Sequence, residues 1–133
     1  MEAKDRKPVV LVADDDLDVA SLVAVSLRRS GFDVVTAGNG SAALEIALET
    51  PPDAFVLDIM MPNLNGYEVV RRLKDEKTTS DLPIVLLSAR AGALDRDYGL
   101  RIGADAYIRK PFPPKQLAET LWTLLESAAE RRV

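Results

Sequence analysis

The 133-residue sequence contains neither cysteine nor histidine. The lack of cysteine excludes disulfide bonds and thiolate nucleophiles, and the lack of histidine excludes Ser-His and Cys-His catalytic pairs. Zinc sites that use thiolate or imidazole ligands are excluded for the same reason. Any chemistry in this chain must therefore use carboxylates, hydroxyls, lysine and the backbone.

Long apolar runs are also absent. No stretch approaches the roughly 18 consecutive apolar residues that predict a membrane span, and the charged start Met-Glu-Ala-Lys-Asp-Arg-Lys lacks the apolar region of a secretory signal. The net charge of -4 disfavours non-specific binding to nucleic acids. We expect a cytoplasmic protein with no membrane association and no direct contact with nucleic acid.

The length suits one well-buried domain and is too short for two ordinary ones. The apolar fraction of 47% and the charged fraction of 29% are typical of globular proteins. We expect an N-terminal tail at residues 1–7, one domain at residues 8–128, and a C-terminal tail or the start of a linker at residues 129–133. The sequence leaves open whether the chain acts alone or is a fragment of a larger protein.

Five predicted strands alternate with five predicted helices. Short apolar or β-branched runs predict strands at 9–13, 32–37, 54–57, 83–87 and 106–108. Helical spacing predicts a first helix with apolar positions Val19, Leu22, Val23 and Leu27, and further helices at 42–49, 67–77, 93–102 and 115–131. Glycines dilute the fourth helix and lower its helix propensity. The alternation predicts a single doubly wound α/β domain, a parallel sheet with helices on both faces.

Polar residues follow four of the five predicted strands, namely Asp14, Asp15, Asp16, Asp58, Ser88 and Lys110. Ligands of such sheets bind beyond the carboxyl ends of the strands, at a topological switch point. Taken singly, Asp16 or Ser88 is explained as a helix cap and Lys110 as a solvated charge. Asp58 is different, because apolar residues flank it on both sides and a lone charge there needs a reason.

Neighbouring first and third strands would bring Asp14, Asp15 and Asp58 together. Clustered carboxylates repel, so either a pKa rises or a cation binds. An all-oxygen set suits Mg²⁺, with Mn²⁺ as a substitute, and Mg²⁺ fills its open positions with phosphate oxygens. The Ser88 hydroxyl and the Lys110 amine would meet the remaining oxygens, so we expect a site for a phosphoryl group.

Four motifs stand at these strand ends: Leu-Val-Ala-Asp-Asp-Asp at 11–16, Val-Leu-Asp-Ile-Met-Met-Pro-Asn-Leu-Asn-Gly at 56–66, Leu-Leu-Ser-Ala at 86–89, and Gly-Ala-Asp-Ala-Tyr-Ile-Arg-Lys-Pro-Phe at 103–112. In this order, they resemble the receiver domains of two-component response regulators, and the resemblance extends from about Pro8 to about Glu126. It implies a flavodoxin-like (βα)5 fold with strand order 2-1-3-4-5.

The resemblance also implies roles for residues of the acidic cluster. Asp58 would accept a phosphoryl group from the phosphohistidine of a histidine kinase or a histidine phosphotransfer protein. Asp15 would bind Mg²⁺ directly, Asp14 through water, and Met60 through its backbone carbonyl. The chain would then be a regulatory phosphoacceptor, whose only reactions are its own phosphorylation and slow dephosphorylation.

Further implied roles concern the neighbouring strands. Lys110 and Ser88 would contact the phosphoryl oxygens, and Tyr107 would turn inward when the Ser88 hydroxyl moves. Pro111 would follow a cis peptide bond. The signal would pass to the surface formed by the segment 93–102, the strand 106–108 and the last helix, where an unknown output domain or effector, or a second copy of the chain, would bind.

Three alternatives remain open at this level. Trp122 either packs along the rim of the core or forms part of an exposed edge for a dimer or an output partner. A receiver-like module that binds partners without phosphorylation would lack a key site residue, and none is missing. A Mg²⁺-dependent phosphatase with an aspartate nucleophile would need an acid two residues after Asp58, where Met60 stands.

Overall fold

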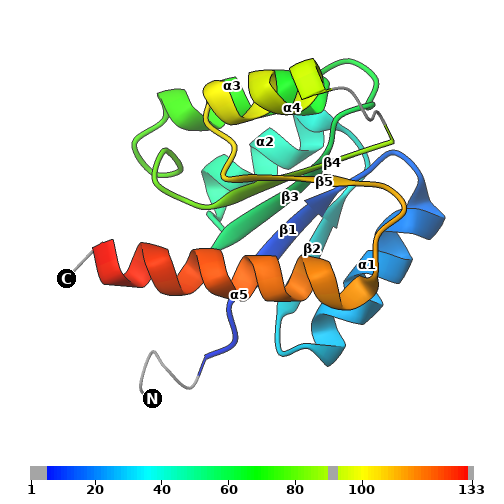
Figure 1. The fold of residues 1–133 in the computed structure, drawn as a ribbon. Coiled ribbons are helices and arrows are strands. Elements are labelled where there is room, and N and C mark those ends of the chain that lie inside the picture. Colours follow the sequence, from blue (N-terminus) through cyan, green and yellow to red (C-terminus); the bar gives the residue numbers. More distant parts are fainter. Residues whose placement is uncertain (1–5, 90–92, 132–133) are drawn as a thin grey trace.

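The strands form one parallel sheet of order β2-β1-β3-β4-β5 in the computed structural model, which describes residues 6–89 and 93–131 (Figure 1). The strands are β1 (Val9–Ala13), β2 (Asp33–Ala37), β3 (Ala54–Asp58), β4 (Ile84–Ser88) and β5 (Ala106–Arg109). The predicted fold class and strand order are confirmed.

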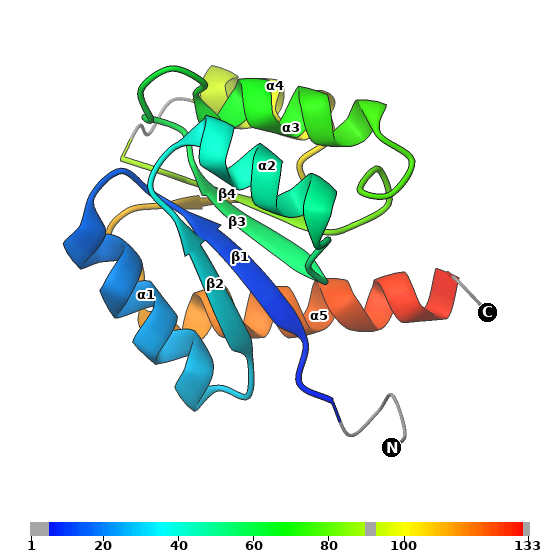
Figure 2. The ribbon, with the colours of Figure 1, turned by 180° about the vertical axis from the view of Figure 1, so that it is seen from behind.

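The helices lie on both faces of this sheet. They are α1 (Leu17–Arg29), α2 (Gly40–Glu49), α3 (Gly66–Asp75), α4 (Ala93–Arg101) and α5 (Pro114–Arg131). Helices α1 and α5 cover one face, and α2, α3 and α4 cover the other (Figures 1 and 2). In the described part of the chain, no helix has the length and apolarity needed to cross a bilayer.

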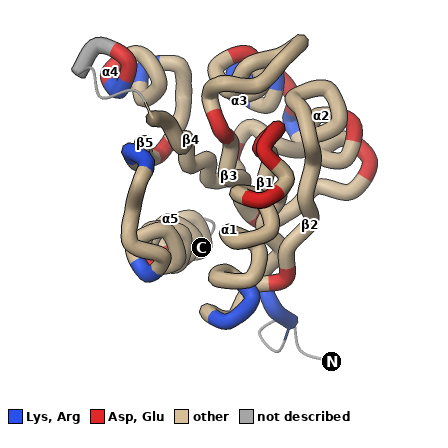
Figure 3. Tube along the Cα trace, turned by 90° about the vertical axis from the view of Figure 1, so that its right-hand side faces the viewer, with Lys and Arg blue, Asp and Glu red and all other residues tan. Residues whose placement is uncertain are grey.

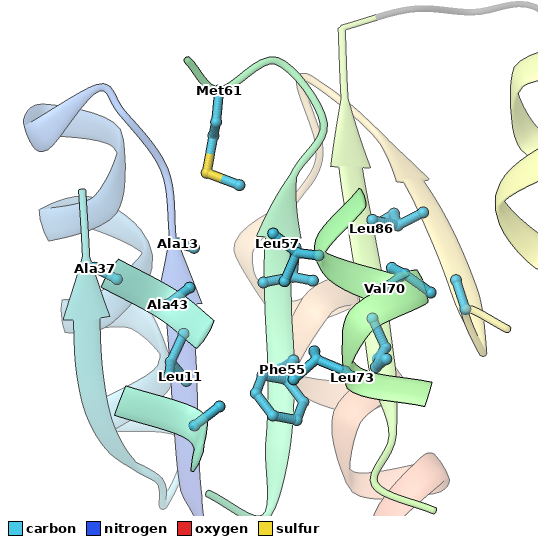
Figure 4. Close-up of a cluster of buried hydrophobic side chains, with 14 of the residues drawn as sticks. Leu11, Ala13, Ala37, Ala43, Phe55, Leu57, Met61, Val70, Leu73 and Leu86 are labelled. Atoms are coloured by element: carbon cyan, nitrogen blue, oxygen red, sulfur yellow. The ribbon is translucent and has the colours of Figure 1, made fainter. Parts of the chain in front are cut away.

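The core consists of two layers, one on each side of the sheet. Because side chains alternate along a strand, Leu11 and Phe55 face the α2–α4 side, and Val10 and Val56 face the α1–α5 side. All five residues of β3 and of β4 are buried, as expected for strands covered on both faces. Figure 4 shows the layer beneath α2 and α3.

Helix α3 ends at Asp75, two residues before the predicted end at Lys77. The chain folds there into a turn, in which the buried Thr79 hydroxyl donates a hydrogen bond of 2.6 Å to the Leu73 carbonyl. The Glu76 amide donates to the same carbonyl at only 3.4 Å, so the side-chain donor supplies the shorter bond at the helix end.

Helix α1 corrects one expected apolar position. Its buried residues are Ala20, Val23, Ala24 and Leu27, which follow the spacing of one helical face. Leu22 falls outside this stripe and is 72% exposed. Leu17, at the start of the helix, is equally exposed, so α1 presents apolar side chains to solvent.

Trp122 packs along the rim of the core, as one of the two alternatives predicted. Its ring stacks on Phe32 with a centroid separation of 4.5 Å, and its indole N–H donates to the Ser30 carbonyl at 3.0 Å. Tryptophan buried in this way commonly satisfies its N–H. The contact joins α5 to the segment before β2.

Candidate functional site

An acidic cluster lies at the carboxyl ends of β1 and β3. These strands pair directly, with Ala13 opposite Leu57, so Asp14 and Asp58 reach the same edge of the sheet. Carboxylate oxygens of Asp14, Asp15 and Asp58 lie within 4.8 Å of one another. In Figure 3, acidic residues lie at the ends of β1 and β3, and the basic end of β5 lies at the same end of the molecule.

The three consecutive aspartates after β1 have different environments. Asp14 is 2% exposed, and its carboxylate accepts a hydrogen bond of 3.0 Å from the Asp16 amide. Asp15 is exposed at the mouth of the cluster. Asp16 caps α1 by accepting from the amides of Asp18 and Val19, as predicted.

Asp58 is 6% exposed and is held by the loop that follows it. The Ile59 amide donates to the Leu87 carbonyl, and the Gly66 amide donates to the Ile59 carbonyl. Met61 is buried and points from the loop back toward the strands (Figure 4). The loop is therefore anchored in the core at both of its ends.

Gly66 allows this loop to fold back closely. A Cβ atom at this position would lie 2.7 Å from the Asp58 carbonyl oxygen and 2.9 Å from the Ile59 Cα atom. The sequence indicated only a turn here, because a close backbone approach between residues eight positions apart is visible only in the fold.

Lys110 reaches across β4 to the acidic cluster. Its Nζ atom lies 3.0 Å from Asp14 Oδ2 and 3.5 Å from Asp58 Oδ1. Its amide donates to the Ser88 carbonyl at 2.7 Å, which places the ends of β4 and β5 side by side. Ser88 is fully buried, and the Lys110–Pro111 peptide bond is cis, as the resemblance implied.

The charges of the cluster are only partly balanced. Burial raises the pKa of Asp58, the charge of Lys110 partly offsets this, and the nearby charge of Asp14 adds to it. Burial alone would lower the pKa of Lys110, but its hydrogen bond to Asp14 and the charges of both carboxylates raise it instead. Lys110 thus pairs with two of the three carboxylates, Asp14 and Asp58. The cluster offers only oxygen ligands, and this ligand set fits Mg²⁺.

Met60 and Tyr107 lie outside the carboxylate cluster itself. The backbone of Met60 hydrogen-bonds to Asp58, and its side chain is 54% exposed. Tyr107 is opposite Leu86 in the sheet and is half-buried against the core layer beneath α3 and α4. Its ring therefore lies on the face of the sheet that α4 covers.

An apolar groove, which the sequence did not indicate, opens beside Lys110. Its volume is about 500 Å³, and Val19, Leu22, Pro111, Phe112 and Leu117 contribute to its lining. It lies between α1 and the start of α5. The exposed Leu22 indicates the groove only when the buried face of α1 is known, and the sequence does not show which face is buried.

Comparisons with known proteins point to one family. A family model described as "Response regulator receiver domain" matches residues 10–121. The transcriptional regulatory protein PrrA of Mycobacterium tuberculosis is 46% identical over 125 residues, which cover 94% of this chain and 53% of PrrA. The alkaline phosphatase synthesis transcriptional regulatory protein PhoP of Bacillus subtilis is 42% identical over 108 residues, which cover 81% of this chain and 44% of PhoP.

A solved structure gives the same result for the fold. The receiver domain of the Francisella response regulator 1452 superposes with a TM-score of 0.85 at 32% identity, over 90% of this chain and 98% of that domain. The chain spans about half the length of the curated relatives it matches.

Proposed function

Because the chain belongs to the response regulator receiver domain family, we propose that it is a phosphorylation-dependent switch with Asp58 as the phosphoryl acceptor. One observation carries this proposal: a buried aspartate lies among two further carboxylates and within 3.5 Å of the Lys110 ammonium. A regulatory domain with such a cluster can accept a phosphoryl group without being an enzyme for other substrates.

The reaction is a phosphoryl transfer from a phosphohistidine. A carboxylate oxygen of Asp58 attacks phosphorus, the P–N bond of the donor breaks, and the imidazole nitrogen keeps the bonding electron pair. Lys110 favours the ionised form of Asp58 and meets the phosphoryl oxygens as a point charge. The buried hydroxyl of Ser88 is the proposed donor to a further phosphoryl oxygen.

The proposed metal ligands are Asp14, Asp15, Asp58 and the Met60 carbonyl. When bound, Mg²⁺, or Mn²⁺ in its place, supplies positive charge that offsets the repulsion between carboxylates and phosphoryl oxygens. The partly balanced charge of the acidic cluster supports this assignment.

The proposed partner is a histidine kinase or a histidine phosphotransfer protein, and we assign its docking to the apolar groove beside Lys110. A donor histidine must reach Asp58, so its protein must cover the surface next to the cluster. The groove is continuous with the site through Lys110, and Leu22 on its rim is 72% exposed. A solvent-exposed apolar rim of this kind favours a protein partner.

The proposed output surface consists of α4, β5 and α5, which would bind an output domain, an effector or a second copy of the chain. A phosphoryl group adds about -1.5 to -2 charges and three acceptor oxygens. These would draw the Ser88 hydroxyl toward Asp58, and Tyr107 would occupy the space that is released. The cytoplasmic location and the domain limits 8–128 remain predictions from the sequence.

Neither alternative has a specific observation in its favour. Met60, with a largely exposed side chain, stands where an aspartate-nucleophile phosphatase needs an acid. The acidic cluster, Lys110 and Ser88 are all present, so a module that works without phosphorylation is not indicated.

Incubation with acetyl phosphate and Mg²⁺ tests the proposed function, with intact mass as the readout. We expect the wild type to gain one labile phosphoryl group, and we expect Asp58→Asn and a metal-chelated wild-type sample to gain none. Equal labelling of wild type and Asp58→Asn would reject Asp58 as the acceptor.

A further inference from the structure

The part of helix α4 whose side-chain burial is described, residues 95–101, buries little apolar surface. Of its residues 95–101, whose burial is described, only Gly99 is buried, and Leu100 is 37% exposed. A surface helix normally turns an apolar stripe toward the core. Contacts other than apolar burial therefore help to hold residues 95–101 in place.

Helix α3 provides these contacts from one of its faces. Tyr67, Arg71 and Lys74 have the spacing i, i+4 and i+7, so their side chains share one side of the helix. This side differs from the stripe of Val69, Val70 and Leu73, which is buried in the core. We call the three residues the α3 clasp.

The first part of the α3 clasp holds the middle of α4. The Tyr67 ring meets the Tyr98 ring edge-on with a centroid separation of 4.9 Å, and the Tyr67 hydroxyl donates to the Asp95 carbonyl at 3.2 Å. The Arg71 guanidinium lies 5.6 Å from the centre of the Tyr98 ring and donates to the Tyr98 hydroxyl. Tyr98 thus makes aromatic, cation–π and hydrogen-bond contacts with α3.

The last part of the α3 clasp holds the turn after α4. The aliphatic carbons of Lys74 lie 2.9–3.2 Å from the place where a Cβ atom of Gly103 would be. The Lys74 ammonium donates to the Ser80 carbonyl at 2.9 Å, in the segment between α3 and β4, and this bond fixes the side chain whose aliphatic part packs against the turn. The middle of α4 is therefore bonded to α3, and the turn after α4 packs against it.

The position of α4 matters for Tyr107. A Cβ atom on Gly99 would lie 2.9 Å from Leu86 and 3.5 Å from the Tyr107 ring. Helix α4 consequently rests directly on β4 and on the proposed switch residue. Any change in how α3 holds α4 changes the space that is available to the Tyr107 ring.

The other end of α3 reaches the acidic cluster. Gly66, the first residue of α3, contacts the Asp58 backbone so closely that a Cβ atom would not fit. Tyr67 is the next residue in the chain. A shift of the loop after Asp58 is thus passed to the first residue of the α3 clasp without an intervening flexible segment.

We propose that Tyr67, Arg71 and Lys74 are positioning residues that hold α4 and couple the acidic cluster to the α4–β5–α5 surface through α3. This route runs beside the one through Ser88 and Tyr107. The inference rests on the proposed function, because the coupling has a purpose only if the charge at Asp58 changes. A coupling of this kind is a free energy shared between two sites.

Hydrogen exchange of the α4 amides measures the hold of the α3 clasp directly. The test variant is Arg71→Ala, and the matched control is Arg72→Ala, an exposed arginine on the same helix outside the α3 clasp. Loss of one cation–π contact and one hydrogen bond predicts about 5-fold faster exchange at residues 95–101 in Arg71→Ala. We expect no change in β1 or β3, and none in Arg72→Ala.

A second measurement separates coupling from simple attachment. We expect phosphorylation of the wild type by acetyl phosphate to change the exchange of α4, and we expect a smaller change in Arg71→Ala at equal labelling. Tyr98→Phe keeps the ring and loses the hydroxyl, so its behaviour should be intermediate.

The inference is overturned if α4 exchange is the same in Arg71→Ala and Arg72→Ala. It is also overturned if phosphorylation changes α4 equally in wild type and Arg71→Ala. Both results would leave the proposed function intact, because labelling of Asp58 is verified separately by mass. A wild type that is not labelled would instead reject the proposed function, and the coupling with it.

Discussion

Replacement of Gly66 by alanine is the most direct test of how the loop after Asp58 is held. The added Cβ would lie 2.7 Å from the Asp58 carbonyl oxygen, and an ordinary contact begins at about 3.4 Å. The loop must therefore move by roughly 0.7 Å, and the atoms in the way are backbone atoms that cannot rotate aside. Gly66 does not have a positive φ, so the contact alone, and no backbone strain, causes the effect.

The contact distance sets the expected size of this effect. Overpacking against a rigid site lowers the free energy of unfolding by about 1–3 kcal/mol. The better helix propensity of alanine offsets up to about 1 kcal/mol of this loss. We expect a net loss of about 1–2 kcal/mol in the free energy of unfolding. A displacement near 1 Å can cost about 100-fold in rate, so labelling by acetyl phosphate should slow by about 10- to 100-fold.

Urea unfolding and the time course of intact mass give the two measurements. The matched control is Gly38→Ala, since a Cβ at Gly38 would have no neighbour within 4 Å. We expect Gly38→Ala to match the wild type in both assays. Gly66→Ala with wild-type stability and a wild-type labelling rate would refute the close approach of α3 to Asp58.

Three further predictions concern charge, attachment and docking. Since burial raises the pKa of Asp58, the folded state loses stability as the pH rises through that pKa. In metal-free buffer near neutral pH, Asp58→Asn should therefore melt at a higher temperature than the wild type, and the difference in melting temperature should narrow on acidification. A difference that widens on acidification would contradict a raised pKa. Trp122→Phe removes the hydrogen bond to the Ser30 carbonyl. It should lower the free energy of unfolding in urea by about 1–2 kcal/mol, with no change in the rate of labelling by acetyl phosphate. Unchanged stability would show that this hydrogen bond contributes nothing. Leu22→Asp should slow phosphoryl transfer from a cognate histidine kinase about 10-fold, while labelling by acetyl phosphate stays the same. The control is Leu48→Asp, a substitution of a half-exposed leucine on α2. Equal transfer rates in the two variants would exclude the groove as the docking surface.

The sheet and the acidic cluster were predictable because they depend on short, regular patterns. Apolar runs such as 9–13 and 54–57 identify strands covered on both faces, and parallel order then brings Asp14 and Asp58 to one edge. A charged residue that directly follows a buried strand can be recognised from the sequence alone. Helix α1 was harder, since Val23 and Leu22 differ by one position and only packing shows which of them is buried.

The close contacts around the site were not predictable from the sequence. Gly66 reads as part of a turn, and its role comes from a backbone that approaches it from the end of β3. Gly99 and Gly103 read as weak points of a helix, yet the structure uses them for close contact with Leu86 and Lys74. Propensity describes what a residue does to its own segment, whereas these glycines act on neighbouring segments.

The distribution of apolar burial decides where a new charge at Asp58 can have an effect. Strands β3 and β4 are fully buried on both faces, so a shift within them would disturb both core layers. Residues 95–101 of helix α4 include no buried large side chain, and their contacts with α3 are polar and aromatic, at a cost of about 1 kcal/mol each to break. Charge repulsion at a buried site easily exceeds that cost. A phosphoryl group should therefore leave the sheet unchanged and move α4, which places the response on the surface proposed for output.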